Sequence, residues 1–381
     1  MKPKIPSSWN ECSWEQLVEI YRLMGEYSDQ RSVRNLHIWL FLTKLVFAEG
    51  EGEIADDGEV TYYLKKAPLS SPQGGKNPIR NILSPLGEPE GAEEFFAVKA
   101  DDLSLYLNGS HLTEEERKVA GKNASRLERM GALDWVDEMV GKGGQGGLTQ
   151  LPIDTITIGK KQWRLPSALI TSITYEQYTN AQQLQQAVWS LTDNLKQEQQ
   201  RIMEELQAGQ SGTLNASPES PEERSDQVSP DDIQQRLAEL EPMAQELQRY
   251  RAQLLSHLLI QAEKGAEYKS EDAEERVDFF VKHIDEHPYL LDILIQHLQS
   301  CLGVYKTQFP DLFSGDGKGS DTIPMVSEVN TINAIMKWQG YQEQQKVFDS
   351  NAIFIFSILN SMTKEAKAIE EANAKMKRHR K

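Results

Sequence analysis

Two histidines and a glutamate near the end of a helical segment form the pattern that comes nearest to a chemical site. His283-Ile284-Asp285-Glu286-His287 has the spacing His-x-x-Glu-His, in which two imidazoles bind zinc and the carboxylate activates a water molecule. Histidines four residues apart share one helical face, but Pro288 follows at once and places His287 on the last turn. We therefore expect a solvent-facing helix end and no metal site. A metal-dependent hydrolase built on His283, Glu286 and His287 is kept as a second alternative.

The other candidates for chemistry are weaker. The glycine-rich segment 141–147 lacks the Gly-Lys-Ser/Thr ending of a phosphate-binding loop, and the polar segment 316–321 has too few carboxylates for a calcium loop. Cys12 and Cys301 have no convincing local histidine or asparagine partner, so both read as buried or semi-buried small residues. We expect a protein that is not an enzyme and that uses no cofactor.

Composition excludes several classes of protein. The chain has 381 residues and a net charge of −17, and such an acidic chain repels phosphate, which argues against nucleic acid as the main partner. The densest apolar stretches, 38–48 and 353–359, fall well short of the roughly 20 residues that cross a bilayer, so no membrane partner is expected. Two cysteines and a polar start without an apolar leader favour the reducing cytoplasm.

Glycine, serine and proline divide the chain into segments. The segment 141–147 is rich in glycine, 209–230 is rich in Ser, Pro and Gly without an aromatic residue, and 314–321 is short and polar. The expected segments are a mostly helical N-terminal domain at 1–150 with an irregular insert at 50–91, a β-hairpin plus a long helix at 151–208, a disordered linker at 209–230, a helical segment at 231–313, a linker at 314–325, and a C-terminal helical segment at 326–381 with a basic tail.

Helical periodicity dominates between these breaks and predicts a mainly α fold, a multi-segment helical protein with long amphipathic helices. Apolar residues recur every third or fourth position from Leu184 to Leu206, and heptad spacing runs from Ile233 to Leu258. We expect these two helices to pair antiparallel, with Pro242 bending the second. The clearest strand signal is residues 155–166, where alternation on both sides of a glycine-containing turn predicts a small β-hairpin.

Two predicted helix starts resemble each other. Ser13 is followed by Gln16 and Thr174 by Gln177, and each pair comes shortly after a proline. In such a capping box the hydroxyl accepts a backbone N–H of the first turn, and the glutamine side chain reaches back to the cap residue. Local cap chemistry alone can generate this likeness, and we prefer that explanation to an internal duplication.

The C-terminal segment contains the most apolar stretch, and a helix apolar over so much of its circumference must be covered by its own chain or by a partner. The basic residues in the last ten positions complement the helix dipole and need no ligand. The residues that we predict to contact a partner lie on the two apolar stripes: Leu184, Val188, Leu191, Leu195, Phe348, Ile355, Leu359 and Met362.

The hairpin 155–166, the segment Ile173–Tyr178 and the segment Asn330–Ile335, which leads into a phenylalanine-rich helix with a lysine-rich end, carry a family resemblance. Together they resemble tail-cluster proteins from phages and prophages of Bacteroidetes-type bacteria, which are described as tail proteins or tail-assembly chaperones. The resemblance covers roughly 153–208 and 326–381, and it transfers no catalytic residue. It implies a noncatalytic tail-assembly factor that binds helical tail proteins such as a tape-measure protein. The alternative is a structural tail or connector component that binds copies of itself.

Overall fold

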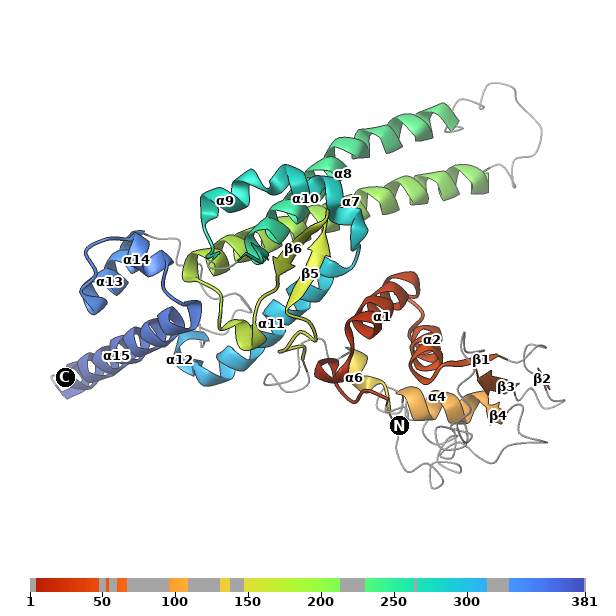
Figure 1. Cartoon of the computed structure of the whole chain (residues 1–381), viewed down its shortest axis with the longest axis horizontal. Helices are drawn as coiled ribbons and strands as arrows, with labels where there is room; N and C mark the ends of the chain where they lie inside the picture. The colour runs from red at the N-terminus through yellow and green to blue at the C-terminus, as the bar shows by residue number, and fades with distance from the viewer. Residues whose placement is uncertain are drawn as a thin grey trace. The chain divides into compact units, whose positions relative to one another are not determined.

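The computed structural model describes residues 5–47, 53–54, 60–66, 96–108, 131–137, 147–212, 230–263, 266–313 and 329–379 (Figure 1). These residues form a mainly α-helical fold, as the periodicity predicts. The chain divides into two units: the first comprises Met1–Ile153 and Asp292–Gln308, and the second comprises Asp154–Leu291 and Phe309–Lys381.

The first unit combines helices with a small antiparallel sheet. Helices α1 (Trp14–Glu26) and α2 (Arg31–Thr43) follow the short 3-10 turn η1 (Trp9–Glu11). Strands β1 (Leu45–Phe47), β2 (Glu53–Ile54) and β4 (Phe96–Lys99) all pair with β3 (Val60–Lys66). Helices α4 (Ala100–Asn108) and α6 (Asp134–Asp137) come later in the chain. Strands β2 and β3 lie within the expected irregular insert at 50–91, and the rest of the insert is outside the described residues.

The core of the first unit is built from buried aromatic and aliphatic side chains. Trp9 and Trp39 are fully buried, and Trp135 lies edge-on to Trp9 with ring centroids 5.2 Å apart. Buried side chains of this size contribute most of the hydrophobic stabilisation of a small unit.

Helix α11 (Leu290–Gln308) supplies the late segment of the first unit. The Tyr21 hydroxyl donates a hydrogen bond to Gln296, and His297 Nδ1 lies 3.0 Å from the carbonyl oxygen of Leu148; all these side chains are buried. The helical segment expected at 231–313 is divided between the two units, because residues 292–308 pack with the first unit. Periodicity detects the helix but not the surface on which it packs.

The second unit begins with the predicted hairpin. Strands β5 (Thr155–Ile158) and β6 (Lys161–Arg164) are antiparallel, and Gly159 in their turn has a φ of +52°. The short strand β7 (Ile260–Gln261) adds to β6 and makes a sheet in the order β5-β6-β7. Because β7 follows directly on a long helix, it ties the end of that helix to the hairpin.

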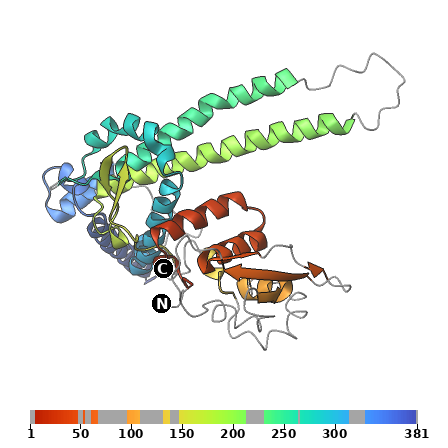
Figure 2. The same ribbon diagram turned by 45° about the vertical axis from the view of Figure 1, so that its right-hand side comes forward.

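Two long helices form most of the second unit. Helix α7 (Tyr175–Gly212) and helix α8 (Pro230–Leu258) run antiparallel and side by side, as Figure 2 shows. Their antiparallel pairing is the predicted one, and Pro242 lies exposed inside α8. The predicted linker at 209–230 is too long, because α7 continues through Gly212 and α8 starts at Pro230; the residues between them lie outside the described part of the chain.

Shorter helices complete the second unit. Helices α9 (Ser270–Glu275) and α10 (Val277–His283) and the 3-10 turn η5 (Ile284–Glu286) follow one another along the chain. Helix α12 (Pro310–Phe313) contacts α15 (Ala352–His379), and α13 (Val329–Gln339) and α14 (Gln345–Phe348) precede α15. Gly340 follows the end of α13 with a φ of +70°, which glycine adopts without steric cost. The predicted linker at 314–325 lies outside the described residues.

Candidate partner-binding surfaces

The histidine pattern binds the β-hairpin of its own unit. Gly159 N–H donates to Glu286 Oε2 (2.9 Å), His283 Nδ1 donates to Glu286 Oε1 (2.6 Å), and His287 Nε2 donates to the Thr157 carbonyl oxygen (2.9 Å). We call His283, Glu286 and His287 the hairpin clasp. The Gly159 N–H, followed by His283, lowers the pKa of the Glu286 carboxyl below its ordinary value.

The clasp geometry corrects two expectations. His283 is the last residue of α10 and a 3-10 turn follows, so the two histidines do not share the helical face that the spacing implies. Both are half-buried against the hairpin and do not face solvent fully. A β-carbon on Gly159 would lie 2.8 Å from His283 Nε2, so the turn covers that nitrogen. Among the described residues, no group of three or more His, Cys, Asp or Glu side chains is placed to hold a metal ion.

The predicted stripe on α7 packs partly against α8. Val188 is buried, whereas Leu184, Leu191 and Leu195 are half-buried. On α8, residues near the C-terminal end of the helix, such as Leu254, are buried, whereas Leu247 is half-buried. Two helices cannot enclose a seam completely, so the stripe keeps part of its apolar surface accessible along α7.

The predicted C-terminal surface is less accessible. Ile355 is fully buried and Leu359 is 5% exposed, whereas Phe348 and Met362 are half-buried. Ile355 and Leu359 pack inside the second unit, where α15 contacts α7 and α12. A partner cannot reach these two side chains in this arrangement, because they are already covered by their own chain.

Several large apolar side chains that the periodicity did not single out are exposed. Trp189 on α7 is 46% exposed, Met203 on the same helix is 55% exposed, and Phe354 on α15 is 44% exposed. Trp189 and Met203 are separated by close to four helical turns at 3.6 residues per turn, so they lie on one side of α7. On α15, Ile369 and Met376 are also exposed. The sequence signal for the exposed Trp189 is its position directly after Val188, which places an aromatic side chain outside the apolar stripe of α7.

The start of α7 is a buried polar network. Gln177 N–H donates to Thr174 Oγ1 (3.1 Å), which is the first half of the predicted capping box. The Gln177 side chain does not return to the cap residue, and its Nε2 donates to the His257 carbonyl oxygen (2.7 Å) near the end of α8. Carbonyl groups in the last turn of a helix lack partners within the helix, so Gln177 satisfies one of them. The prediction of a complete second capping box is therefore wrong.

His257 extends this network to Tyr268. Its Nδ1 lies 2.7 Å from the Tyr268 hydroxyl, which also accepts Asn180 Nδ2–H at 3.1 Å. Burial, followed by the charge of Arg276, lowers the pKa of His257 to about 4, and burial raises the pKa of Tyr268 to about 12. Both groups are therefore neutral at pH 7, and the Tyr268 hydroxyl donates to the unprotonated Nδ1.

The thiol of Cys12 is poorly suited to nucleophilic chemistry. It is buried in the first unit, and burial, followed by the charge of Glu11, raises its pKa to about 12. The thiolate, which is the reactive form, is therefore scarce at neutral pH.

Comparisons with family models, with curated proteins and with solved structures give no match for this chain. Within the described residues, none of the helices combines the length and the apolar character needed to span a bilayer.

Proposed function

We propose that this chain is a noncatalytic phage tail-assembly factor that binds helical tail proteins, such as a tape-measure protein, in the bacterial cytoplasm. The observation that carries the proposal is the exposure of large apolar side chains on long helices, above all Trp189 and Met203 on one side of α7. Large aromatic side chains are enriched at the centres of protein interfaces, and a helical partner laid along this side of α7 would cover Trp189 together with Met203.

The pairing of α7 with α8 supports this mode of binding. The two helices hold each other in place through Val188 and the buried end of α8, so the exposed face of α7 is presented without a large cost in ordering. The net charge of −17 opposes non-specific self-association of a chain with such exposed apolar residues.

Co-expression with candidate tail proteins from neighbouring genes tests the proposal. The tagged full chain should co-purify a helical tail protein, and Trp189→Glu should abolish that co-purification because it places a charge in the apolar contact. Ser190→Glu, which adds the same charge at the next exposed residue, is the matched control and should retain the partner. Equal recovery of the partner with both variants would contradict this use of α7. Ile355→Asp is unsuitable, because Ile355 is buried and the variant would damage the fold.

A structural tail or connector component is the second candidate, because the same exposed side chains would serve contacts between copies of this chain. Light scattering of the purified chain separates the two. A stable ring or filament that Trp189→Glu disperses favours the structural component, whereas a monomer or small oligomer favours the assembly factor.

A further inference from the structure

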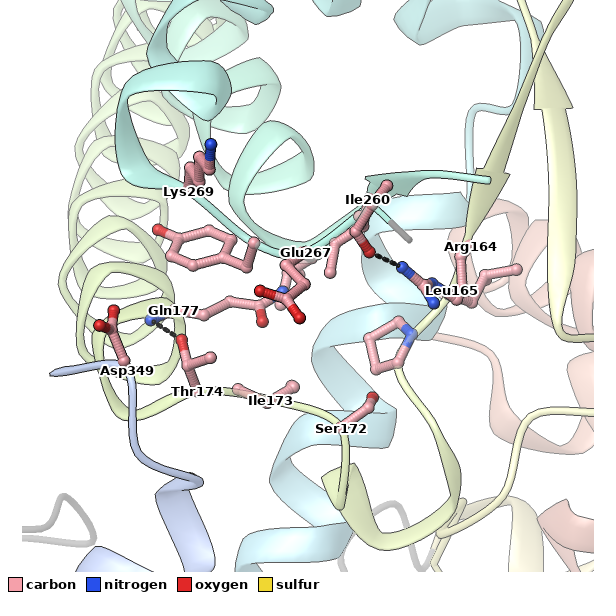
Figure 3. A pocket seen from close by; sticks show the side chains of 14 residues that line it. Arg164, Leu165, Ser172, Ile173, Thr174, Gln177, Ile260, Glu267, Lys269 and Asp349 are labelled. Carbon is pink, nitrogen blue, oxygen red and sulfur yellow. Dashed lines mark hydrogen bonds between the residues drawn. The ribbon is translucent and has the colours of Figure 1, made fainter. Parts of the chain in front are cut away.

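The second unit contains a polar cavity beside the start of α7 (Figure 3). Its volume is about 530 Å³, which lies in the range of roughly 300–1,000 Å³ typical of small-molecule sites. The side chains that line it come from the hairpin, the first turn of α7, the segment after β7 and the turn before α15. The polar and charged lining residues that matter here are Arg164, Gln177, Glu267, Tyr268, Lys269 and Asp349.

Gln177 gives the cavity an acceptor without a partner. The side chain is 1% exposed, and its Oε1 makes no hydrogen bond with any residue in the described part of the chain. The amide orientation follows from its other contact, because the His257 carbonyl oxygen can only accept and so must face Nε2. A buried carbonyl oxygen without a donor costs about 1–3 kcal/mol, and a ligand N–H placed against Oε1 would remove that cost.

The charges around the cavity favour a cation. Figure 3 shows the Glu267 carboxylate among the lining side chains. The Lys269 ammonium points away from this carboxylate. The Arg164 guanidinium donates to the Ala266 carbonyl oxygen and is held there. Asp349, a second acidic lining residue, lies close enough to Glu176 that its charge, after burial, raises the pKa of the Glu176 carboxyl. The lining therefore carries two acids, Glu267 and Asp349, and two bases, of which Arg164 is engaged by a carbonyl oxygen and Lys269 points away.

We propose that this cavity binds the ammonium or guanidinium group of an organic cation, with Gln177 Oε1 accepting one N–H and Glu267 supplying the opposite charge. The cavity is larger than either group, so it also holds the carbon chain that carries it. This site does not depend on the proposed function. The cation is either a free small molecule or the side chain of a lysine or arginine in a partner, and both offer the same N–H donors.

Calorimetric titration of the full chain tests the site with two probes, agmatine and the peptide acetyl-Gly-Arg-Gly-amide. We expect saturable one-to-one binding of at least one probe. Tighter binding of agmatine identifies a free cation as the ligand, and tighter binding of the peptide identifies a partner side chain. Glu267→Gln should weaken binding about tenfold, because it removes the opposing charge from an exposed loop without disturbing the fold.

Matched controls separate the site from general attraction to an acidic protein. Glu371→Gln removes the same charge from the exposed face of α15, and Gln16→Leu alters the corresponding glutamine of α1; neither should change binding. Gln177→Leu should weaken binding as Glu267→Gln does, and Glu267→Gln decides the matter alone if circular dichroism shows that Gln177→Leu is unfolded. The proposal is overturned if neither probe gives saturable heat at millimolar concentration. It is equally overturned if Glu371→Gln weakens binding as much as Glu267→Gln.

Discussion

The starts of α1 and α7 have similar sequences but obtain their polar partners differently. At α1, Ser13 Oγ accepts Gln16 N–H (3.2 Å) and Ser13 N–H donates to Gln16 Oε1 (2.8 Å), so the box is closed within four residues. At α7, Gln177 turns to the end of α8, and Tyr175 N–H donates to the carbonyl oxygen of Ser350 (2.8 Å). The same local motif therefore serves a self-contained cap in one unit and a junction of distant segments in the other.

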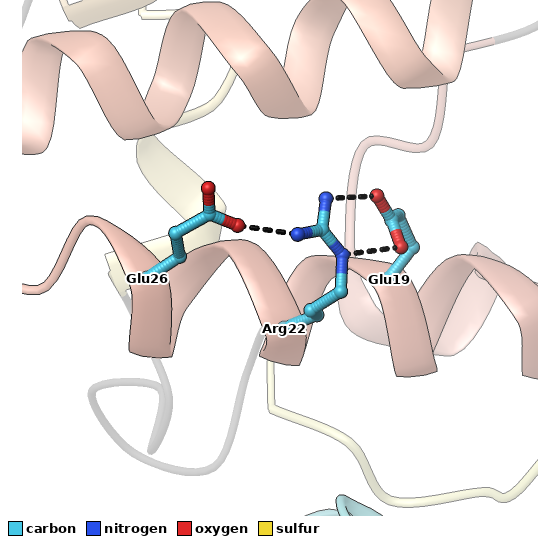
Figure 4. Close-up of polar contacts among 3 residues, drawn as sticks. All are labelled: Glu19, Arg22 and Glu26. Carbon is cyan, nitrogen blue, oxygen red and sulfur yellow. Dashed lines mark hydrogen bonds and ion pairs between the residues drawn. The ribbon is translucent and has the colours of Figure 1, made fainter.

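The surface of α1 shows the same local character. Arg22 lies between Glu19 and Glu26, one turn before and one turn after it, and its guanidinium bonds to both carboxylates (Figure 4). All three side chains are at least partly exposed, so water and salt weaken these ion pairs. Sequence-local contacts can be lost one at a time, whereas the contacts at the start of α7 depend on the fold of the second unit.

The largest expected effect comes from removing the distant support of α7. Phe356 on α15 is fully buried and lies edge-on to Tyr178, with ring centroids 4.9 Å apart. Phe356→Ala should lower the free energy of unfolding by about 3–5 kcal/mol, because it leaves a cavity. Phe354→Ala, at an exposed position two residues earlier, should change it by less than about 0.5 kcal/mol. Urea denaturation measures the free energy of unfolding of both variants. If the two variants lose similar amounts of stability, α7 does not depend on the contact between Phe356 and Tyr178.

The pH dependence of stability should differ between the two starts. Burial lowers the pKa of His257 from 6.5 to about 4, so the unfolded chain takes up a proton as the pH falls below 6.5 and the folded chain does not. The free energy of unfolding should therefore fall by about 2–3 kcal/mol between pH 6.5 and 4. His257→Gln, which keeps a polar group beside Tyr268, should flatten this part of the curve.

At α1 the corresponding group is Glu15, whose pKa is lowered by its backbone hydrogen bond and by Ser13. A lowered carboxyl pKa stabilises the fold above the unfolded value of about 4.5, and this stabilisation is lost only as the pH falls below it. Peptides from α1 should therefore keep their protection from hydrogen exchange between pH 6.5 and about 4.5. Loss of protection at both helix starts in the same window would contradict the comparison.

The two glutamines provide the most direct test of the comparison. Gln177→Ala should cost about 1–3 kcal/mol, because the lost donor to the buried His257 carbonyl oxygen and the cavity left by the side chain together outweigh the removal of the unpartnered Oε1. Gln16→Ala should cost about 0.5–1 kcal/mol, because water replaces the lost partner at a half-buried site. Native-state hydrogen exchange should show faster exchange at the end of α8 for Gln177→Ala and only at the start of α1 for Gln16→Ala.

The smallest effect is expected at Arg22. Arg22→Gln removes two ion pairs on a solvated helix face, each worth about 0.3–0.5 kcal/mol. The change should become undetectable in molar salt, because exposed charges are screened over about 3 Å there. Thermal melting at low and high salt measures it. A salt-independent loss would show that Arg22 acts through packing of its carbon chain.

The sequence was sufficient where the signal is local. Alternation around Gly159 predicts the hairpin, and apolar periodicity predicts α7, α8 and their antiparallel pairing. The hairpin clasp was not predictable, because Gly159 and Glu286 are 127 residues apart and no periodic pattern relates them. The two-residue strand β7 is too short for alternation to reveal it. The exposed Trp189 and the altered role of Gln177 depend on which faces other helices cover. The likeness to phage tail-cluster proteins, and the function it implies, stay predictions.

The first unit is built from two stretches that are far apart in the chain, and this affects how it folds during synthesis on the ribosome. Residues 292–308 complete this unit, but residues 154–291 are translated before them and belong to the second. A nascent chain that ends before α11 presents Tyr21 and Leu148 without Gln296 and His297. The N-terminal part must therefore wait, partly assembled, until most of the polypeptide has emerged, and a fragment truncated at residue 153 should be prone to aggregation and degradation.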